Sequence, residues 1–165
     1  MAPEQSMERN EEEFAKVVEQ YKAVIYKVCS MYADGRDEMA DYCQEVLMNM
    51  WRGWGSFRGE CALSTWVYRV ALYTCVSFVR RKCSRPRSMA LTIDMPVADD
   101  GDRAPMLREL YRLIGRLNRL DRALILLWLD ERPYAEIAEI MGISKANVAV
   151  KIMRIKERLK RMSEE

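Results

Sequence analysis

The chain contains no histidine among its 165 residues. Histidine is the commonest metal ligand and the commonest general acid or base, so its absence removes many catalytic and metal-binding classes. The sequence also has no glycine-rich loop that would hold phosphates and no cluster with metal-ligand spacing. We therefore expect no catalytic residues, no metal or other cofactor, and no small-molecule substrate.

Long apolar runs are missing as well. No stretch approaches the roughly 18 apolar residues that span a bilayer. The N-terminal stretch "MAPEQSMERNEEEF" is polar and acidic, without the apolar segment of a secretory signal. Together these two absences predict a cytoplasmic protein.

Cysteines are present, but not in a paired pattern. Their number is odd and no two have CxxC spacing, which argues against a disulfide framework and against a zinc finger. We expect small buried or half-buried thiols in a reducing compartment, with a redox role as the alternative. The five are Cys29, Cys43, Cys61, Cys75 and Cys83.

The alternating pattern of a β-strand is also absent, and apolar residues recur instead at helical spacing. This spacing predicts helices over residues 10–32, 38–54 and 63–82. The glycine-rich "GWGSFRGE" predicts a loop between the last two. In the third helix, one inner face is expected to hold Leu63, Val67, Ala71, Thr74 and Phe78.

A change of composition divides the chain. The stretch "SRPRSMALTIDMPVADDGDRAP" has three prolines and no sustained period, and helical patterns resume after it. We therefore predict an all-α protein with two small helical domains, residues 1–85 and 105–165. A flexible linker over residues 86–104 would join them.

Charge is distributed unevenly behind a net value of +2. Residues 1–50 hold 11 acidic and 5 basic side chains, whereas residues 51–87 hold 8 basic side chains and one acidic. Residues 105–165 hold 13 basic and 9 acidic. Basic segments of this kind suit a polyanion such as nucleic acid.

The end of the chain has the pattern of a helix-turn-helix. Pro133 suits the start of a helix, Gly142 suits its end, and Ser144 can cap the next helix. The next helix is expected to bury Val148, Ile152, Ile155 and Leu159. Polar and basic side chains on its other face would contact base edges and phosphates. We expect this DNA-binding set to be Ser144, Lys145, Asn147, Lys151 and Arg154.

The first half carries further motifs. The stretch "DYCQEVLMNMWRGWGSFRGECALSTWVYRVALYTCVSFVRRK" resembles region 2 of bacterial extracytoplasmic-function sigma factors of the sigma-70 family. "YAEIAEIMGISKANVAVKIMRIKERL" resembles the region 4 helix-turn-helix that reads the −35 element. The resemblance covers nearly the whole chain. It implies an alternative sigma factor that binds core RNA polymerase, directs it to promoters and promotes DNA melting.

The resemblance assigns roles to two sets of residues in the first domain. One helix resembles the part that docks on the polymerase clamp, through Asp41, Gln44, Glu45, Met48 and Trp51. The loop and the helix after it resemble the part that recognises and melts the −10 element. That set is Ser56, Phe57, Arg58, Gly59, Arg69, Tyr73, Arg80, Arg81 and Lys82. Tyr73 stands where the family often has asparagine, which favours stacking over amide hydrogen bonding.

Chemistry agrees with these roles. A base that leaves the stack needs a pocket or a stacking surface, and basic side chains can hold phosphates. The resemblance implies binding to the clamp and flap regions of core polymerase and to promoter DNA, and control by an anti-sigma factor. Two alternatives remain open from the residues alone: a stand-alone helix-turn-helix regulator and a helical adaptor that binds only protein.

Overall fold

A computed structural model describes the backbone of residues 3–82 and 104–165, and the side chains of residues 10–78 and 105–165. Within these ranges the chain forms seven helices and no strand, so the all-α prediction is confirmed. Among the described residues, no helix is long and apolar enough to cross a membrane. The helices are α1 (Pro3–Ser30), α2 (Gly35–Trp54), α3 (Leu63–Lys82), α4 (Ala104–Gly115), α5 (Arg119–Leu129), α6 (Tyr134–Met141) and α7 (Lys145–Ser163).

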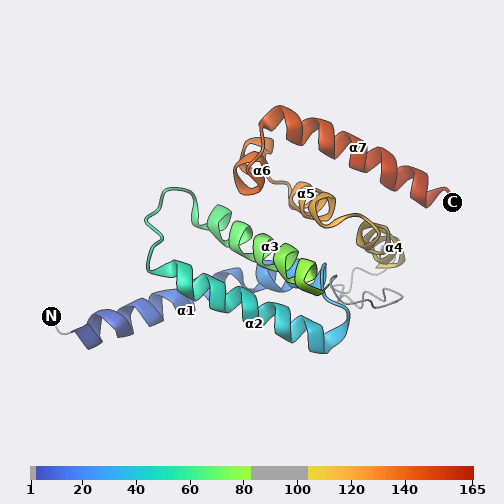
Figure 1. Cartoon of the computed structure of the whole chain (residues 1–165). Coiled ribbons are helices and arrows are strands. Elements are labelled where there is room, and N and C mark those ends of the chain that lie inside the picture. The colour runs from blue at the N-terminus through green and yellow to red at the C-terminus, as the bar shows by residue number, and fades with distance from the viewer. Residues whose placement is uncertain (1–2, 83–103) are drawn as a thin grey trace.

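Helices α1, α2 and α3 pack against one another as a three-helix bundle (Figure 1). Their shared core includes Val46, Met50, Val67 and Ala71, each fully buried. Thr74 is also buried, and its hydroxyl accepts a hydrogen bond of 3.1 Å from the Asn49 side chain. The predicted inner face of α3 is therefore confirmed at its centre, while Leu63 and Phe78 at its ends are half-buried.

Helix α3 is buried on a second side that periodicity did not predict. Thr65, Tyr68, Leu72 and Cys75 are at most 2 % exposed and follow one another by three or four residues. A helix with two buried faces has little amphipathic contrast, because only a narrow stripe remains for solvent. The apolar periodicity of the sequence therefore indicates one of these two buried faces and does not indicate the other.

Helices α4 to α7 form the second bundle, with α5 at its centre. Residues 123–127 are five consecutive buried positions, because α4, α6 and α7 all pack on α5 and α3 contacts it as well. Asn118 caps α5 by accepting a hydrogen bond of 2.9 Å from the Asp121 backbone N–H. The capping fixes where the central helix begins.

The helix-turn-helix forms from the residues that predicted it. Gly142 has φ of +66°, a left-handed conformation that glycine adopts without strain. The Ser144 hydroxyl accepts a hydrogen bond of 3.1 Å from the Asn147 backbone N–H and caps α7. All four predicted core residues of α7 are buried, namely Val148, Ile152, Ile155 and Leu159.

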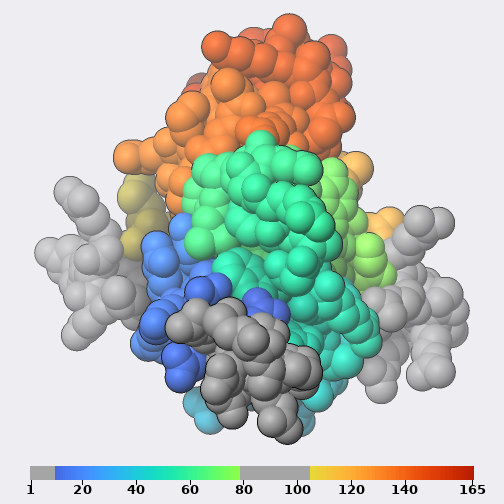
Figure 2. Space-filling view, turned by 90° about the vertical axis from the view of Figure 1, so that its left-hand side faces the viewer, coloured from blue at the N-terminus to red at the C-terminus, as the bar shows by residue number. Residues whose placement is uncertain are grey.

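The two bundles are in contact. Helix α3 lies against α6 and α5, so the second bundle sits on the side of α3 that faces away from α2 (Figure 1). The space-filling view shows the α6–α7 end in direct contact with the first bundle (Figure 2). The predicted linker, residues 86–104, lies outside the described residues except for Ala104, which begins α4. The predicted domain boundaries stay a prediction.

Candidate nucleic-acid interface

The predicted polymerase-binding residues lie along one side of α2, at spacings of three and four residues. Asp41 and Gln44 are exposed and Glu45 is half-buried. Met48 is 40 % exposed and Trp51 is 39 % exposed, which is unusual for large apolar side chains. The side therefore combines acidic and polar groups with two apolar anchors.

Trp51 also belongs to a chain of aromatic contacts. Its ring meets the Phe14 ring edge-on at 5.1 Å between centroids. Phe14 in turn lies 6.0 Å from Trp54, which stacks on Phe57 at 6.2 Å. These contacts connect the N-terminal half of α1 to the end of α2 and to the loop that follows.

The predicted −10 loop forms a pocket of about 300 Å³ with an aromatic floor. The Phe57 and Trp66 rings lie 5.1 Å apart, and both are half-buried. Gly59 has φ of +73°, so the turn of this loop requires a glycine. The lining residues are Ser56, Phe57, Arg58, Glu60, Cys61, Trp66, Arg69 and Glu139. Glu139 comes from α6 and had no predicted role here.

Two further residues predicted for the −10 element, Arg69 and Tyr73, contact the second bundle. The Arg69 guanidinium donates a hydrogen bond of 2.9 Å to the backbone carbonyl of Glu139. The Tyr73 hydroxyl donates one of 3.2 Å to the backbone carbonyl of Met141. Nothing in the sequence indicated these contacts. The side chains of Arg80, Arg81 and Lys82 lie outside the described residues.

The predicted −35 residues surround the start of α7. Ser144, Lys145 and Asn147 are exposed in its first turn, and Arg154 is exposed further along. Lys151 is half-buried, where it lines a groove of about 430 Å³ between α7 and the start of α5. The other lining residues are Asn118, Asp121, Arg154, Ile155, Glu157, Arg158 and Arg161.

The groove adds a residue that sequence reasoning missed, Arg161. Arg161 follows Arg158 by three residues and Arg154 by seven, so all three lie on one side of α7. A search for basic residues at positions i, i+4 and i+7 would have found this set. Four basic side chains against two acidic ones give the groove a positive field that suits phosphate.

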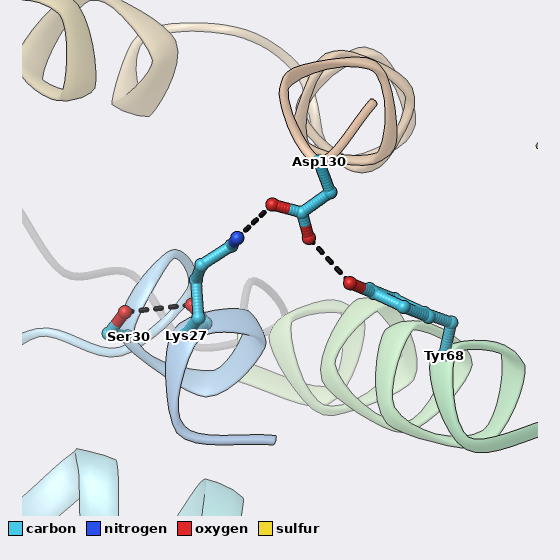
Figure 3. A network of polar contacts seen from close by, with 4 residues as sticks. All are labelled: Lys27, Ser30, Tyr68 and Asp130. Carbon is cyan, nitrogen blue, oxygen red and sulfur yellow. Dashed lines mark hydrogen bonds and ion pairs between the residues drawn. The ribbon is translucent and has the colours of Figure 1, made fainter. Parts of the chain in front are cut away.

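A network of polar side chains joins the two bundles (Figure 3). Asp130, at the end of α5, forms an ion pair with Lys27 of α1 and accepts a hydrogen bond of 2.6 Å from the Tyr68 hydroxyl of α3. The Asp130 side chain is only 11 % exposed. Burial, and next the positive charge of Arg132, lower the pKa of Lys27. Residues 62 and 103 positions apart meet here, and no local pattern could have paired them.

The four described cysteines are buried or half-buried, as expected, and Cys83 lies outside the described residues. Cys29 and Cys75 are fully buried with their sulfur atoms 4.0 Å apart, and Cys43 is half-buried. Hydrogen bonding to Cys29, and then burial, raises the pKa of the Cys43 thiol. Among the described residues, no group of three or more side chains is placed to hold a metal ion.

Two family models match the chain, one on each bundle. Residues 17–85 match the family described as Sigma-70 region 2. Residues 107–159 match the family described as Sigma-70, region 4. The two matches stand in the order that the resemblance predicted and together span most of the sequence.

Known relatives agree with these matches. The chain is 29 % identical over 161 residues to the ECF RNA polymerase sigma-E factor of Escherichia coli, covering 87 % of this chain and 83 % of the relative. It is 24 % identical over 151 residues to the ECF RNA polymerase sigma factor SigM of Mycobacterium tuberculosis, covering 90 % of this chain and 76 % of the relative.

Solved structures share the fold. The sigma factor RpoE of Bartonella quintana, in complex with the anti-sigma factor NepR, matches with a TM-score of 0.76 at 17 % identity, covering 92 % of this chain and 97 % of that one. CnrH, in complex with the cytosolic domain of CnrY, matches with a TM-score of 0.69 at 16 % identity, covering 97 % and 93 %. With both regions matched in order on two helical bundles, the chain belongs to the sigma-70 family, among its extracytoplasmic-function members.

Proposed function

We propose that this chain is an alternative sigma factor. It binds core RNA polymerase, directs it to promoters through their −10 and −35 elements, and promotes melting of the DNA. The observation that carries the proposal is the presence of both sigma-70 regions, in order, in one chain. Members of the family act without catalysing a reaction. We expect this chain to act in the cytoplasm, because RNA polymerase is located there.

The separate roles within this function are assigned to the three surfaces described above. The exposed side of α2 suits the polymerase clamp, since Met48 and Trp51 offer apolar anchors beside acidic groups. The aromatic pocket of the loop suits an unstacked base. The start of α7 suits a major groove, and the basic groove suits phosphates. We also expect the second bundle to bind the flap region of the polymerase.

An anti-sigma factor is a further expected partner. One solved structure that shares this fold is of a sigma factor in complex with an anti-sigma factor, NepR. The other, CnrH, was determined in complex with the cytosolic domain of CnrY. A stand-alone helix-turn-helix regulator is not favoured, because such a protein has no need of region 2. The helical adaptor is not favoured either, since the basic groove beside the helix-turn-helix suits DNA.

Transcription from purified components tests the proposal. Core RNA polymerase is combined with the chain and with genomic fragments of the source organism, and the transcripts are sequenced. We expect new start sites with a shared motif at −10 and −35 that need both the chain and the core enzyme. Identical transcripts with and without the chain would refute the proposal. Operator binding without polymerase would support the regulator instead.

A further inference from the structure

Gly53 lies in the last turn of α2, where the presence of a glycine needs an explanation. Glycine weakens a helix relative to alanine, and Gly53 does not have the positive φ that would require it. Close packing explains it instead. A Cβ added at Gly53 would lie 3.3 Å from the Trp66 indole, which is closer than ordinary van der Waals contact. The missing side chain therefore lets the Trp66 ring pack directly on the backbone of α2.

The carbonyl of Gly53 holds the start of the loop that runs from α2 to α3 (Figure 1). It accepts one hydrogen bond of 3.1 Å from each of the backbone N–H groups of Ser56 and Phe57, and one of 2.9 Å from the Ser56 hydroxyl. Ser56 and Phe57 both line the loop pocket. Gly53 thus acts on the pocket in two ways, since its carbonyl fixes the loop backbone and its Cα sets how deeply Trp66 packs.

Trp54 supports the same pocket from the next position in the chain. Its ring stacks on Phe57 with 18° between the planes, and it packs against Trp66 with 6.0 Å between the ring centroids. The Phe14 ring of α1 lies 6.0 Å from Trp54. Neither Gly53 nor Trp54 is among the residues that line the pocket. They contact the rings of its floor and not the space in which a base would lie.

The spacing of the floor rings decides how well a base can stack. Attraction between packed atoms falls steeply with distance, and a gap of about 0.5 Å forfeits roughly a quarter of it. A methyl group added at Gly53 would displace the Trp66 ring, which is already in contact with Phe57 and Trp54. Such a displacement changes the surface that a base would meet.

We propose that Gly53 and Trp54 are positioning residues for base capture, because they set where Phe57 and Trp66 lie in the floor of the loop pocket. The inference rests on the proposed function, which gives that pocket the role of taking an unstacked base. The two residues act through the aromatic floor without touching the DNA. Base-dependent binding therefore depends on the end of α2 as well as on the loop itself.

Two alanine substitutions, two residues apart, isolate the contact with Trp66. Gly53→Ala adds one methyl group 3.3 Å from the indole. Gly55→Ala adds the same group at the C-cap of α2, where φ is −65° and no described residue outside its own helical turn comes within 4 Å of the added Cβ. Both changes replace glycine by alanine in right-handed helical backbone, so the contact with Trp66 is the main difference. Trp54→Leu removes the supporting ring, and Trp54→Phe is the milder variant should leucine destabilise the bundle.

Fluorescence anisotropy measures binding by each full-length protein, alone and in complex with core polymerase. The probes are a dye-labelled pool of random 12-nucleotide single strands and an abasic strand with the same number of phosphates. The ratio of the two affinities reports base capture, whereas a general loss of structure or charge changes both affinities together.

We expect the ratio to be about ten in the wild type, about three in Gly53→Ala and about one in Trp54→Leu, with Trp54→Phe between the last two. Gly55→Ala should keep the wild-type ratio. The affinity for the abasic strand should stay within about twofold of the wild type in every variant, because the phosphate contacts are unchanged.

A wild-type ratio retained in Gly53→Ala and in both Trp54 variants would overturn the proposal and leave the role of the pocket intact. An equal fall in Gly55→Ala would also overturn it, because the contact with Trp66 would then not be the cause. A ratio of one in the wild type, in each form that is measured, would overturn both the proposal and the role of the pocket in base capture. Failure to bind polymerase would count against the sigma-factor function, while the ratio for the chain alone would still decide the positioning role.

Discussion

Helices α2 and α3 are neighbours in one bundle and have equal length, yet their outer sides differ. The outer side of α2 is exposed and holds Met48 and Trp51, each about two-fifths accessible. The corresponding side of α3 is covered by the second bundle, so that Tyr68 and Leu72 are each 2 % exposed. The side of α2 was predicted from the sequence to bind polymerase, and Arg69 and Tyr73, next to the covered side of α3, were predicted to bind DNA. In this arrangement the side of α2 is exposed, whereas Arg69 and Tyr73 donate hydrogen bonds to α6, although Tyr73 remains 45 % exposed.

The difference shows that the predicted use of a surface and its availability are separate questions. Arginine and tyrosine donors on α3 suit DNA, but they equally suit the free carbonyls at a helix end. Which acceptor they contact depends on where the second bundle lies. The comparison of α2 with α3 can therefore be tested by variants that change one side and leave the other intact.

The largest effect is expected from the covered side of α3. Leu72→Ala should lower the free energy of unfolding by about 2–5 kcal/mol, because a fully buried leucine is replaced by a cavity. Met48→Ala on α2 should cost no more than about 0.5 kcal/mol, since that side chain is largely exposed. Urea denaturation measures both. Equal losses would mean that the two sides are not differently buried.

A second prediction concerns the open side of α2. Asp41→Lys should weaken binding to core polymerase about tenfold, because it places a like charge against a partner surface expected to be basic. Glu19→Lys, an equal charge reversal on α1, is the control and should have little effect. Surface plasmon resonance gives the affinities, and urea denaturation verifies that stability is unchanged. A matching loss in both variants would point to net charge and not to the α2 side.

A smaller effect is expected on the second bundle. Lys151→Ala should weaken binding to a −35 duplex by a few-fold and lower the slope of log affinity against log salt by about one. Lys160→Ala lies more than two turns further along α7, outside the groove, and should change neither. Fluorescence anisotropy over a salt series measures the slope. Polymerase binding should remain as in the wild type, whereas a loss there would contradict the separation of surfaces.

The smallest effect near neutral pH involves Tyr32 at the contact between the bundles. Burial raises the pKa of Tyr32 above its ordinary value of 10.0. A raised pKa means that its contribution to stability is present below about pH 10 and is lost as the pH rises above that value, since the unfolded chain releases the proton first. The midpoint of thermal unfolding should therefore fall more steeply above pH 10 in the wild type than in Tyr32→Phe. Tyr26→Phe, at an exposed position, should behave as the wild type.

Much of the fold follows from local signals in the sequence. The helix-turn-helix is the clearest case, because Gly142, Ser144 and the buried stripe of α7 act within a few residues of one another. The predicted ends of the helices differ from the observed ones. The helix predicted over residues 10–32 runs from Pro3 to Ser30, and the one predicted from residue 38 begins at Gly35. There, polar helix formers continue a helix without adding to its apolar pattern.

The sequence predicted the candidate sites as sets of residues, but it did not predict what those residues contact in the folded chain. The side of α2 could be derived because its members share one helix. The contacts of Arg69 and Tyr73 could not, because their partners lie 70 and 68 positions away. Glu139 in the loop pocket was missed for the same reason. Its role depends on the approach of another bundle.

The sequence by itself determined the helices, the helix-turn-helix and the residue types on each outer side, because periodicity and capping operate over a few residues. Tertiary structure alone decided which side of α3 the second bundle covers. The pairing of Asp130 with Lys27 and Tyr68, and of α6 carbonyls with α3 donors, requires two bundles to meet. Such contacts are set by the shape and charge of folded surfaces, which exist only after each bundle has formed.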